Sequence, residues 1–236
     1  MIRSIAFAAL AALNFGIASA QADEPRVTSQ PIPNGRPASE LAAGQVEVTE
    51  VFWLGCPHCL ALESFVQSWM KDKADYIVFN RVHAAWRPEL VAHARLYYAL
   101  HALGRADLDA AALKVVNAFD TTTNKFTNRL YVPGNEAETL RIQLEFAEAH
   151  GIKKADFLNA YNSRAVLAKI EESKRLTAQW QVIAVPRIII NGKYQAFLTV
   201  YGGEPELFPL VDKIAAEEHA QSAGGLRSAG SGKAAP

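Results

Sequence analysis

The chain has 236 residues, and its 24 lysine and arginine residues are balanced by 24 aspartate and glutamate residues. A formal net charge of zero argues against nucleic acid as the main partner, because proteins that bind nucleic acid usually carry a clear basic excess. Half of the residues are apolar, which excludes a disordered chain, and only two are cysteines, which excludes a disulfide-dense scaffold and an all-cysteine zinc site.

The first twenty residues have the pattern of a secretory signal peptide. Arg3 gives a positive start, an apolar stretch covers residues 5–17, and Ala18-Ser19-Ala20 has the small-x-small pattern of a cleavage site. A membrane anchor is the alternative, but a transmembrane helix needs about 20 apolar residues. We therefore expect residues 1–20 to be removed on export, leaving a soluble protein in a compartment that permits disulfides.

The next segment, 21–43, is rich in proline, glycine and small polar residues, and we expect it to be mobile. Residues 45–54 have the pattern of a strand with apolar side chains on both faces, as expected for an inner strand that is covered on both sides. A helix is predicted to begin at Pro57, because proline is favoured at the first helical position. A second strand at 76–83 completes a βαβ unit, whose right-handed crossover makes the two strands parallel.

From about residue 88 to residue 179 the apolar spacing is helical throughout. Helices are predicted over four stretches: 90–103, 107–119, 135–151 and 156–179. Asp107 is a candidate cap for the second. Asn135 with Glu138 has the spacing of a capping box at the start of the third, and Asn162-Ser163 is a candidate break in the fourth.

Strands return near the end of the chain. Residues 187–190 and 194–200 are joined by Asn191-Gly192, which is a strong signal for a two-residue hairpin turn. A last helix is predicted over 204–219. The tail, 220–236, is dominated by glycine, serine and alanine and cannot bury enough surface to offset its ordering entropy, so we expect it to be disordered.

The order of these elements is a βαβ unit, then helices, then a β-hairpin and a helix. It indicates an α/β domain formed by two separate stretches of chain, 44–86 and 180–219. The all-helical stretch, 87–179, is inserted between them.

The chemistry is predicted at Cys56-Pro57-His58-Cys59, where a strand ends and a helix begins. As the N-cap, Cys56 meets free N–H groups and the positive end of the helix dipole, and both favour its thiolate. The two intervening residues bring Cys59 one helical turn along, within reach of the first sulfur. His58 adds a nearby cation or hydrogen-bond donor, which lowers the thiol pKa further. The pattern favours a redox-active dithiol.

Three other interpretations of the cysteine pair are weaker. A structural disulfide would close too short a loop to restrict the unfolded chain much, since the stabilisation grows with loop size. A zinc site would need two further ligands, and the remaining histidines are scattered along the chain. The third alternative is a pair of buried, inert thiols.

Two segments resemble the signature segments of the DsbA family of thiol–disulfide oxidoreductases, in the thioredoxin superfamily. They are Val-Thr-Glu-Val-Phe-Trp-Leu-Gly-Cys-Pro-His-Cys (48–59) and Ala-Val-Pro-Arg-Ile-Ile-Ile-Asn-Gly-Lys-Tyr (184–194). The resemblance covers nearly the whole chain after the signal peptide. It implies a thioredoxin-like fold with an inserted all-helical domain, and an enzyme that needs no metal or organic cofactor.

The resemblance also implies roles for single residues. Cys56 would be the exposed nucleophile that forms mixed disulfides, and Cys59 the buried resolving thiol. Pro57 and His58 would tune the pair. Pro186 matches the family's cis-proline, which would bring Val185 against the sulfurs, where its backbone could pair with an extended substrate. Without the resemblance, the sequence favours a trans proline that opens a strand.

Glu50 lies six residues before Cys56, where the family carries a buried acid beneath the active site. Strand alternation places Glu50 on an apolar face, where a lone charge is costly. Its implied role is proton transfer with Cys59, and the alternative is a solvated glutamate at an edge. The family's usual lysine partner is absent from residues 79–83, which leaves Arg81 and His83 as candidate partners.

The Pro-His pair between the cysteines resembles the oxidant members of the superfamily. The resemblance implies a monomeric periplasmic oxidant that donates its Cys56–Cys59 disulfide to unfolded exported proteins with free thiols. A DsbB-type inner-membrane quinone oxidoreductase would then re-oxidise it. The alternatives are a disulfide isomerase or reductase of the same superfamily and, in a different class, a periplasmic metal-binding chaperone.

Overall fold

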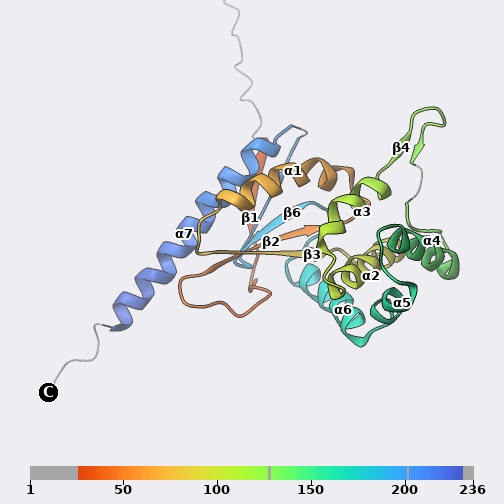
Figure 1. Ribbon diagram of the computed structural model, residues 1–236. Helices are drawn as coiled ribbons and strands as arrows, with labels where there is room; N and C mark the ends of the chain where they lie inside the picture. The colour runs from red at the N-terminus through yellow and green to blue at the C-terminus, as the bar shows by residue number, and fades with distance from the viewer. Residues whose placement is uncertain (1–25, 127–128, 201, 231–236) are drawn as a thin grey trace, which may run out of the picture.

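The computed structural model describes residues 26–126, 129–200 and 202–230 (Figure 1). The expected signal peptide, 1–20, lies outside these residues. A five-stranded sheet forms the centre of the fold, with strand order β1-β7-β6-β2-β3. Its strands are β1 (Val27–Pro31), β2 (Val46–Phe52), β3 (Ile77–His83), β6 (Arg187–Ile190) and β7 (Tyr194–Leu198).

Strand β2 is the inner strand of the sheet. All seven of its residues are buried, which confirms the predicted strand with two covered faces. It pairs with β3 in parallel, as the βαβ pattern predicted, and with β6 in antiparallel orientation. In the parallel pairing Glu50 stands opposite Arg81. The two strands therefore bring an acid and a base to neighbouring positions in the middle of the sheet.

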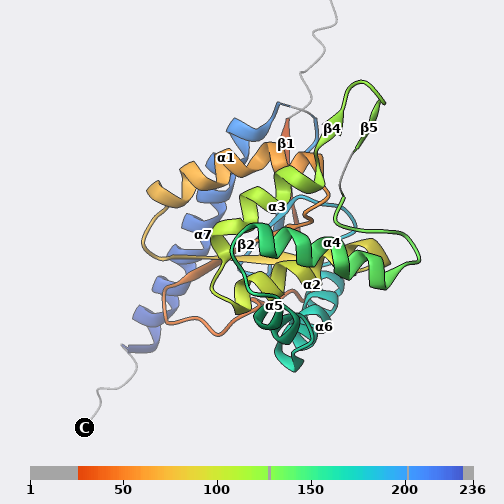
Figure 2. The same ribbon diagram turned by 45° about the vertical axis from the view of Figure 1, so that its right-hand side comes forward.

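The two faces of the sheet are covered by different helices. One face packs against α1 (Pro57–Asp72) and α7 (Glu204–Gly230), and Val48, Leu62 and Val211 lie in that apolar cluster. The other face packs against the helical insertion, where Val51 and Ile189 contact a cluster that includes Trp180. Figures 1 and 2 both show the insertion gathered at one end of the sheet, away from the end of α7.

The insertion contains five α-helices in its described part: α2 (Pro88–Ala102), α3 (Asp109–Val116), α4 (Glu136–Ala149), α5 (Lys154–Tyr161) and α6 (Arg164–Gln179). The Asn135 side chain accepts a hydrogen bond from the Glu138 N–H, 3.0 Å away, which confirms the predicted cap of α4. The predicted break at Asn162-Ser163 is also confirmed, because it separates α5 from α6.

The predicted helix over 107–119 is wrong at both ends. A short 3-10 turn, Ala106–Leu108, precedes α3, and α3 ends at Val116. Asp107 does not cap α3, because its carboxylate pairs with the Arg105 side chain at 2.9 Å instead. Within the stretch expected to be helical throughout, β4 (Phe119–Asp120) and β5 (Lys125–Phe126) form a small hairpin.

That hairpin has a local cause. The Asp120 carboxylate accepts hydrogen bonds from the Thr122 backbone N–H at 2.8 Å and from the hydroxyl groups of Thr122 and Thr123 at 2.6 and 2.8 Å. These bonds hold the chain in a turn rather than a helix. The β-branched threonines, moreover, are poor helix formers.

The N-terminal segment was expected to be mobile over 21–43. For its described part, residues 26–43, this is corrected by β1, which pairs with β7 at the edge of the sheet. The Glu47 carboxylate in β2 ties down the following stretch. It accepts hydrogen bonds from the backbone N–H groups of Ala38 and Ser39 at 2.7 and 3.1 Å. The segment is therefore held by the sheet at two places.

The C-terminal part holds one confirmed and one corrected expectation. Asn191 and Gly192 both have positive φ, 52° and 66°, and form the predicted turn between β6 and β7. The last helix does not end at residue 219, because α7 continues to Gly230. Alanine has the highest helix propensity, and no proline interrupts the chain between Pro209 and Pro236. The remainder of the expected tail, 231–236, lies outside the described residues.

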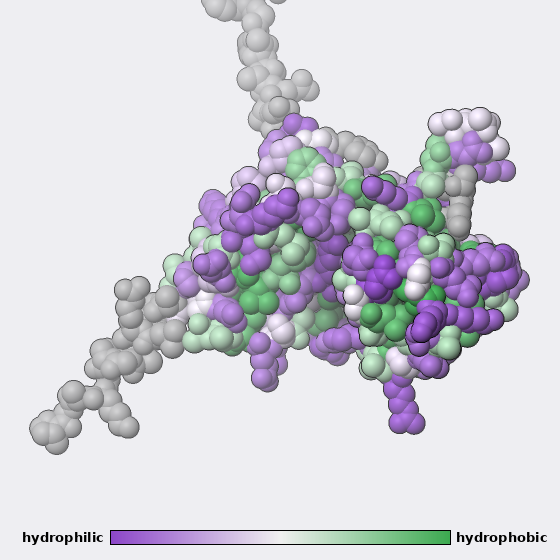
Figure 3. Space-filling model, in the orientation of Figure 1, coloured by the Kyte–Doolittle hydropathy of each residue, from purple (hydrophilic) through white to green (hydrophobic). Residues whose placement is uncertain are grey.

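Hydrophilic residues cover most of the face seen in Figure 3, and apolar residues reach it in separate areas between α1 and α7 and around α3 and α5. None of the helices in the described ranges combines the length and the apolar character needed to cross a membrane.

Candidate active site

The cysteine pair lies at the junction of β2 and α1, as the sequence predicts. Cys56 is the N-cap of α1, and its sulfur accepts a hydrogen bond from the Cys59 backbone N–H at 3.4 Å. Pro57 follows at the first position of the helix and is exposed, and His58 is half-buried. Both cysteines are free thiols, so the structure shows the dithiol form.

Both cysteines are buried, which corrects the expectation of an exposed Cys56. The residue is 5% exposed, against 1% for Cys59. The loop before β6 covers the Cys56 sulfur, which donates a hydrogen bond to the Val185 carbonyl oxygen at 3.6 Å. A reacting thiol therefore has only a small part of Cys56 to approach.

The two thiols have different proton affinities. The pKa of Cys56 is lowered, mainly by a hydrogen bond from the Cys59 thiol and also by the backbone N–H groups of Cys59 and His58. Burial raises the pKa of Cys59 well above its usual value. The backbone N–H of His58 is thus among the groups that lower the pKa of Cys56. Cys56 is consequently the more acidic of the two thiols.

The loop before β6 also contributes to the site, because it lies against Cys56. The Val185-Pro186 peptide bond is cis, which confirms the expected conformation of Pro186. Its position places the Val185 carbonyl beside the Cys56 sulfur, although the two residues are 129 positions apart in the chain.

Glu50 is buried beneath the pair, as predicted, with 1% of its surface exposed. Its carboxylate lies 2.8 Å from Nε of Arg81, which identifies Arg81 as the charge partner that the sequence left open. Burial raises the pKa of Glu50 to about 7, despite the opposing charge of Arg81. Its negative charge in turn contributes to raising the pKa of Cys59. A carboxyl group that titrates near neutrality thus acts on the buried thiol.

Arg81 is shared among several acids. Its guanidinium also pairs with Glu63 of α1 at 2.6 Å and lies 3.9 Å from Asp109 of α3. His101 at the end of α2 contacts Asp109 at 3.0 Å. The excess of carboxylates over Arg81 is one reason why the pKa of Glu50 stays high, since the charges of Glu63 and Asp109 both raise it.

His83, the other candidate partner, has a different role. Its ring is fully buried, and burial lowers its pKa to about 3, so it is neutral. Nδ1 donates to the Ala84 carbonyl at 2.8 Å, and Nε2 accepts from the Leu54 N–H at 3.2 Å. His83 therefore fixes the backbone two residues before Cys56.

Further contacts hold the same turn, and the sequence analysis missed them. The Trp53 indole N–H donates to His93 at 2.8 Å, and the Asn117 amide donates to the Leu54 carbonyl at 2.7 Å. A Cβ on Gly55 would lie 2.3 Å from the Trp53 indole, so only glycine fits between the tryptophan and the cysteine. His93 and Asn117 come from the insertion, and no local sequence pattern links them to the motif.

Within the described ranges, no three histidine, cysteine, aspartate or glutamate side chains are grouped as ligands for a metal ion. No protein-family model matches the chain.

Curated relatives match most of its length. The chain is 31% identical over 215 residues to the thiol:disulfide interchange protein DsbA of Pseudomonas aeruginosa, a match that covers 91% of this chain and 95% of the relative. It is 32% identical to the DsbA of Pseudomonas syringae pv. tomato, over 92% of this chain and 95% of the relative. The chain belongs to the DsbA family.

Solved structures agree with this assignment. The crystal structure of Pseudomonas aeruginosa DsbA superposes with a TM-score of 0.69 at 28% identity, covering 83% of this chain and 94% of that one. The DsbA of Xylella fastidiosa shows the same fold, with a TM-score of 0.67 at 23% identity and coverage of 81% and 95%. The protein is therefore a thiol:disulfide oxidoreductase with the thioredoxin-like DsbA fold and its helical insertion.

Proposed function

We propose that this DsbA-family protein is an oxidant, which donates its Cys56–Cys59 disulfide to unfolded exported proteins with free thiols. The observation that carries the proposal is the difference between the two thiols. The pKa of Cys56 is lowered at the start of α1, while that of Cys59 is raised by burial. A stabilised thiolate favours the reduced enzyme over its disulfide, so the disulfide is readily given away.

The first step forms a mixed disulfide. A substrate thiolate attacks the Cys56 sulfur, a bond forms between these two sulfurs, and the Cys56–Cys59 bond breaks with its electron pair going to Cys59. The thiolate of Cys59 is disfavoured in its buried position. A proton from Glu50, whose pKa is about 7, can neutralise it.

The second step releases the product. A second substrate thiolate attacks the substrate sulfur of the mixed disulfide, and Cys56 leaves as its stabilised thiolate. Two substrate thiols are oxidised to one disulfide, and the enzyme's disulfide is reduced to the dithiol. Low pKa makes Cys56 a good leaving group in this step.

The substrate chain needs a place beside the sulfur. The loop at Val185 and Pro186 supports a role in binding extended substrate, because it presents backbone groups next to Cys56. In this proposal the Val185 backbone pairs with the substrate chain, while Pro57 and His58 form the start of the helix that holds the thiolate.

The signal-peptide pattern at the start of the sequence and the DsbA family together indicate the compartment in which the reaction takes place. We place the enzyme in the periplasm as a monomer, with residues 1–20 removed on export. The dithiol must be re-oxidised after each turnover, and we assign that step to a DsbB-type inner-membrane quinone oxidoreductase, which passes the electrons to quinone.

The equilibrium of the Cys56–Cys59 couple with glutathione tests the proposal. An oxidant should stay largely reduced in glutathione mixtures that keep an ordinary structural disulfide oxidised, because such disulfides have potentials below about −300 mV. It should also oxidise a reduced, unfolded protein stoichiometrically. A strongly reducing couple, or efficient rearrangement of wrong disulfides without net oxidation, would favour the reductase or isomerase alternative.

A further inference from the structure

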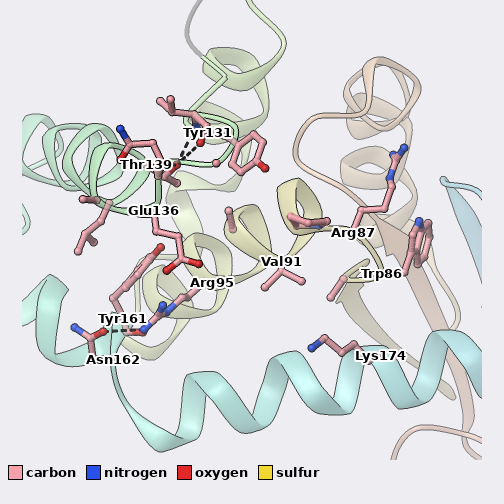
Figure 4. Close-up of a pocket in the computed structure, with 18 residues that line it drawn as sticks. Trp86, Arg87, Val91, Arg95, Tyr131, Glu136, Thr139, Tyr161, Asn162 and Lys174 are labelled. Atoms are coloured by element: carbon pink, nitrogen blue, oxygen red, sulfur yellow. Dashed lines mark hydrogen bonds between the residues drawn. The ribbon is translucent and has the colours of Figure 1, made fainter.

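A cavity of about 750 Å³ opens between α2, the start of α4 and α6 (Figure 4). Its volume lies within the range of about 300–1,000 Å³ that is typical of ligand pockets. Aromatic and aliphatic side chains form much of its wall, among them Trp86, Tyr131, Tyr161, Val91 and Leu140. The cavity is separate from the cysteine motif, and the reaction proposed above makes no use of it.

Arg95 gives the cavity a fixed positive charge. Its guanidinium donates to the Tyr161 carbonyl at 2.9 Å and to the Asn162 side-chain oxygen at 2.7 Å, and it lies 4.2 Å from the centre of the Tyr161 ring. These acceptors are neutral, so they orient the charge without cancelling it. Arg87 and Lys174 also line the cavity, although Lys174 is paired with Glu171 at 2.7 Å, and Glu136 is the single acid in the described lining.

The cavity adjoins the redox site. Arg87 lies over the Trp53 ring at 5.9 Å, and the Trp53 carbonyl accepts the Cys56 backbone N–H at 3.0 Å. The Trp53 indole donates a hydrogen bond to His93. The His93 ring packs edge-on against the Tyr131 ring, with 6.2 Å between the ring centres. The same few side chains therefore support the cysteine turn and one wall of the cavity.

Exposed apolar residues lie both at the cavity and close to the loop that contacts Cys56. Trp86, at the cavity, is 37% exposed, and Ile183, two residues before Val185, is 88% exposed. Both are in loops at the edge of the sheet where β2 ends, because β3 runs parallel to β2 and β6 runs antiparallel to it. Exposed large apolar residues of this kind often mark a binding surface.

We propose that the cavity is a subsite for the polypeptide whose cysteine is bonded to Cys56. It accepts an apolar side chain of that polypeptide, and Arg95 binds a neighbouring carboxylate. The inference rests on the proposed function, because it is the mixed disulfide with Cys56 that holds the polypeptide beside the cavity. The proposed ligand is an unfolded polypeptide with an apolar and an acidic residue near its cysteine.

The kinetic experiment uses single-cysteine peptides of about twelve residues, which span about 40 Å when extended. One peptide carries leucine and glutamate in the part beyond the cysteine, and its partner carries serine and lysine there. The quantity measured is the rate constant for reaction of the reduced peptide with the oxidised enzyme, divided by that for glutathione. We expect this ratio to be about tenfold higher for the leucine–glutamate peptide, as a buried apolar anchor typically contributes.

Substitutions of residues that line the cavity test whether it is the subsite. Trp86→Ala and Tyr131→Ala should each lower the ratio for the leucine–glutamate peptide several-fold. Arg95→Gln should also lower the ratio for the leucine–glutamate peptide, and Arg95→Lys should restore part of it. Leu167→Ala is the matched control, since Leu167 is 45% exposed on α6 and does not line the cavity. An unchanged ratio in Trp86→Ala, or an equal loss in Leu167→Ala, would overturn the proposal.

A trapped complex gives an answer independent of rates. In a Cys59→Ser enzyme, the mixed disulfide between Cys56 and a peptide with a photo-reactive phenylalanine analogue should persist. Cross-links should then map to α2 and to residues 131–140. Cross-links confined to α1 or α7, or to a second enzyme molecule, would contradict the subsite. Failure of the wild-type enzyme to oxidise either glutathione or peptide would count against the proposed function instead.

Discussion

At the scale of single residues, the two sulfurs differ in what surrounds them. Cys56 receives hydrogen bonds from the start of α1, whereas Cys59 lies one turn further along and is almost fully enclosed. The start of α1 therefore stabilises the thiolate of Cys56, whereas burial one turn further along disfavours the thiolate of Cys59. This difference can be tested without any substitution.

Iodoacetamide should alkylate Cys56 at a lower pH and faster than Cys59, because only the thiolate reacts and only Cys56 has a lowered pKa. Mass spectrometry of the modified peptides, over a series of pH values, gives the rate at each cysteine. The denatured protein is the control, in which both cysteines should react alike. A folded Cys56 that titrates near the unperturbed thiol value of about 8.5 would contradict the assignment.

Glu50 is expected to be a residue that costs stability. Its pKa is raised from 4.5 to about 7 by burial, so the folded protein binds the proton more tightly than the unfolded chain. The cost is absent below about pH 4.5 and fully present above about pH 7, where it amounts to about 3 kcal/mol. Glu50→Gln should therefore raise the free energy of unfolding by up to that amount at pH 8 and by little at pH 4.

Denaturant unfolding of the two proteins at several pH values measures this difference. Arg81 keeps Glu63 as a partner at 2.6 Å in the variant, so it is not left unpaired. The same substitution should slow peptide oxidation below pH 7, where Glu50 holds a proton for Cys59. A variant that is less stable at pH 8 and equally fast would show that Glu50 is an ordinary ion-pair partner.

At the scale of elements, the N-terminal segment is joined to the sheet by one buried carboxylate. Glu47 is 1% exposed and accepts bonds from Ala38, from both the backbone and the hydroxyl of Ser39, and from Asn80 at 3.2 Å. Removing the acceptor breaks these bonds, and each costs only about 0.5–1.5 kcal/mol, because Ala38 and Asn80 are half-buried and Ser39 is exposed, so water can replace the carboxylate.

Glu47→Ala should lower the free energy of unfolding by about 2–4 kcal/mol and speed hydrogen exchange at the Ala38 and Ser39 amides. Glu47→Gln is the matched control, because it keeps one oxygen acceptor and should lose less. Exchange measured by NMR separates the local effect from the global one. Unchanged exchange at these two amides would show that the segment is held by β1 alone.

The sequence predicts the elements whose pattern is local. Strand β2 with its buried faces, the helix that begins at Pro57 and the Asn191-Gly192 turn all carry their signals within a few residues. Strand β1 does not, because three of its five residues are exposed and its partner, β7, lies about 170 positions away in sequence. Its pairing depends on the finished sheet.

The residues of the site also fall into those that the sequence predicts and those that it does not. The cysteine motif, Glu50 and Pro186 could be identified from the sequence, because each lies within or close to a recognisable segment. Arg81 was one of two candidates, and the parallel register of β2 and β3 decides between them. His93 and Asn117 could not be found, since they reach the cysteine turn from α2 and the end of α3 only after the insertion has packed.

At the scale of the whole molecule, the insertion and the sheet form one support for the dithiol. Residues from α2, α3, β3 and the loop before β6 all contact the turn between β2 and α1. The stabilisation of the Cys56 thiolate is therefore a property of the folded molecule and is lost on unfolding. This couples the redox state of the cysteines to the stability of the entire fold.

The reduced protein should consequently be more stable than the oxidised one, although a disulfide usually stabilises a fold. The lowered pKa of Cys56 contributes stability that is fully present above the unfolded value, about 8.5, and is lost as the pH falls through the folded value. The gap in unfolding free energy should therefore narrow on acidification. By thermodynamic linkage it should also match the shift in potential between the folded and unfolded couples, at about 1.4 kcal/mol for every 30 mV.

Urea unfolding of both redox forms at pH 8 and pH 5, beside the glutathione equilibrium at each pH, checks the two sides of this relation. The Cys56→Ser, Cys59→Ser double variant controls for effects of pH on the rest of the fold. An oxidised form that is the more stable at pH 8 would mean that the disulfide is held rather than donated. It would then be the reductase alternative that the thermodynamics supports, with the same fold and the same pair of cysteines.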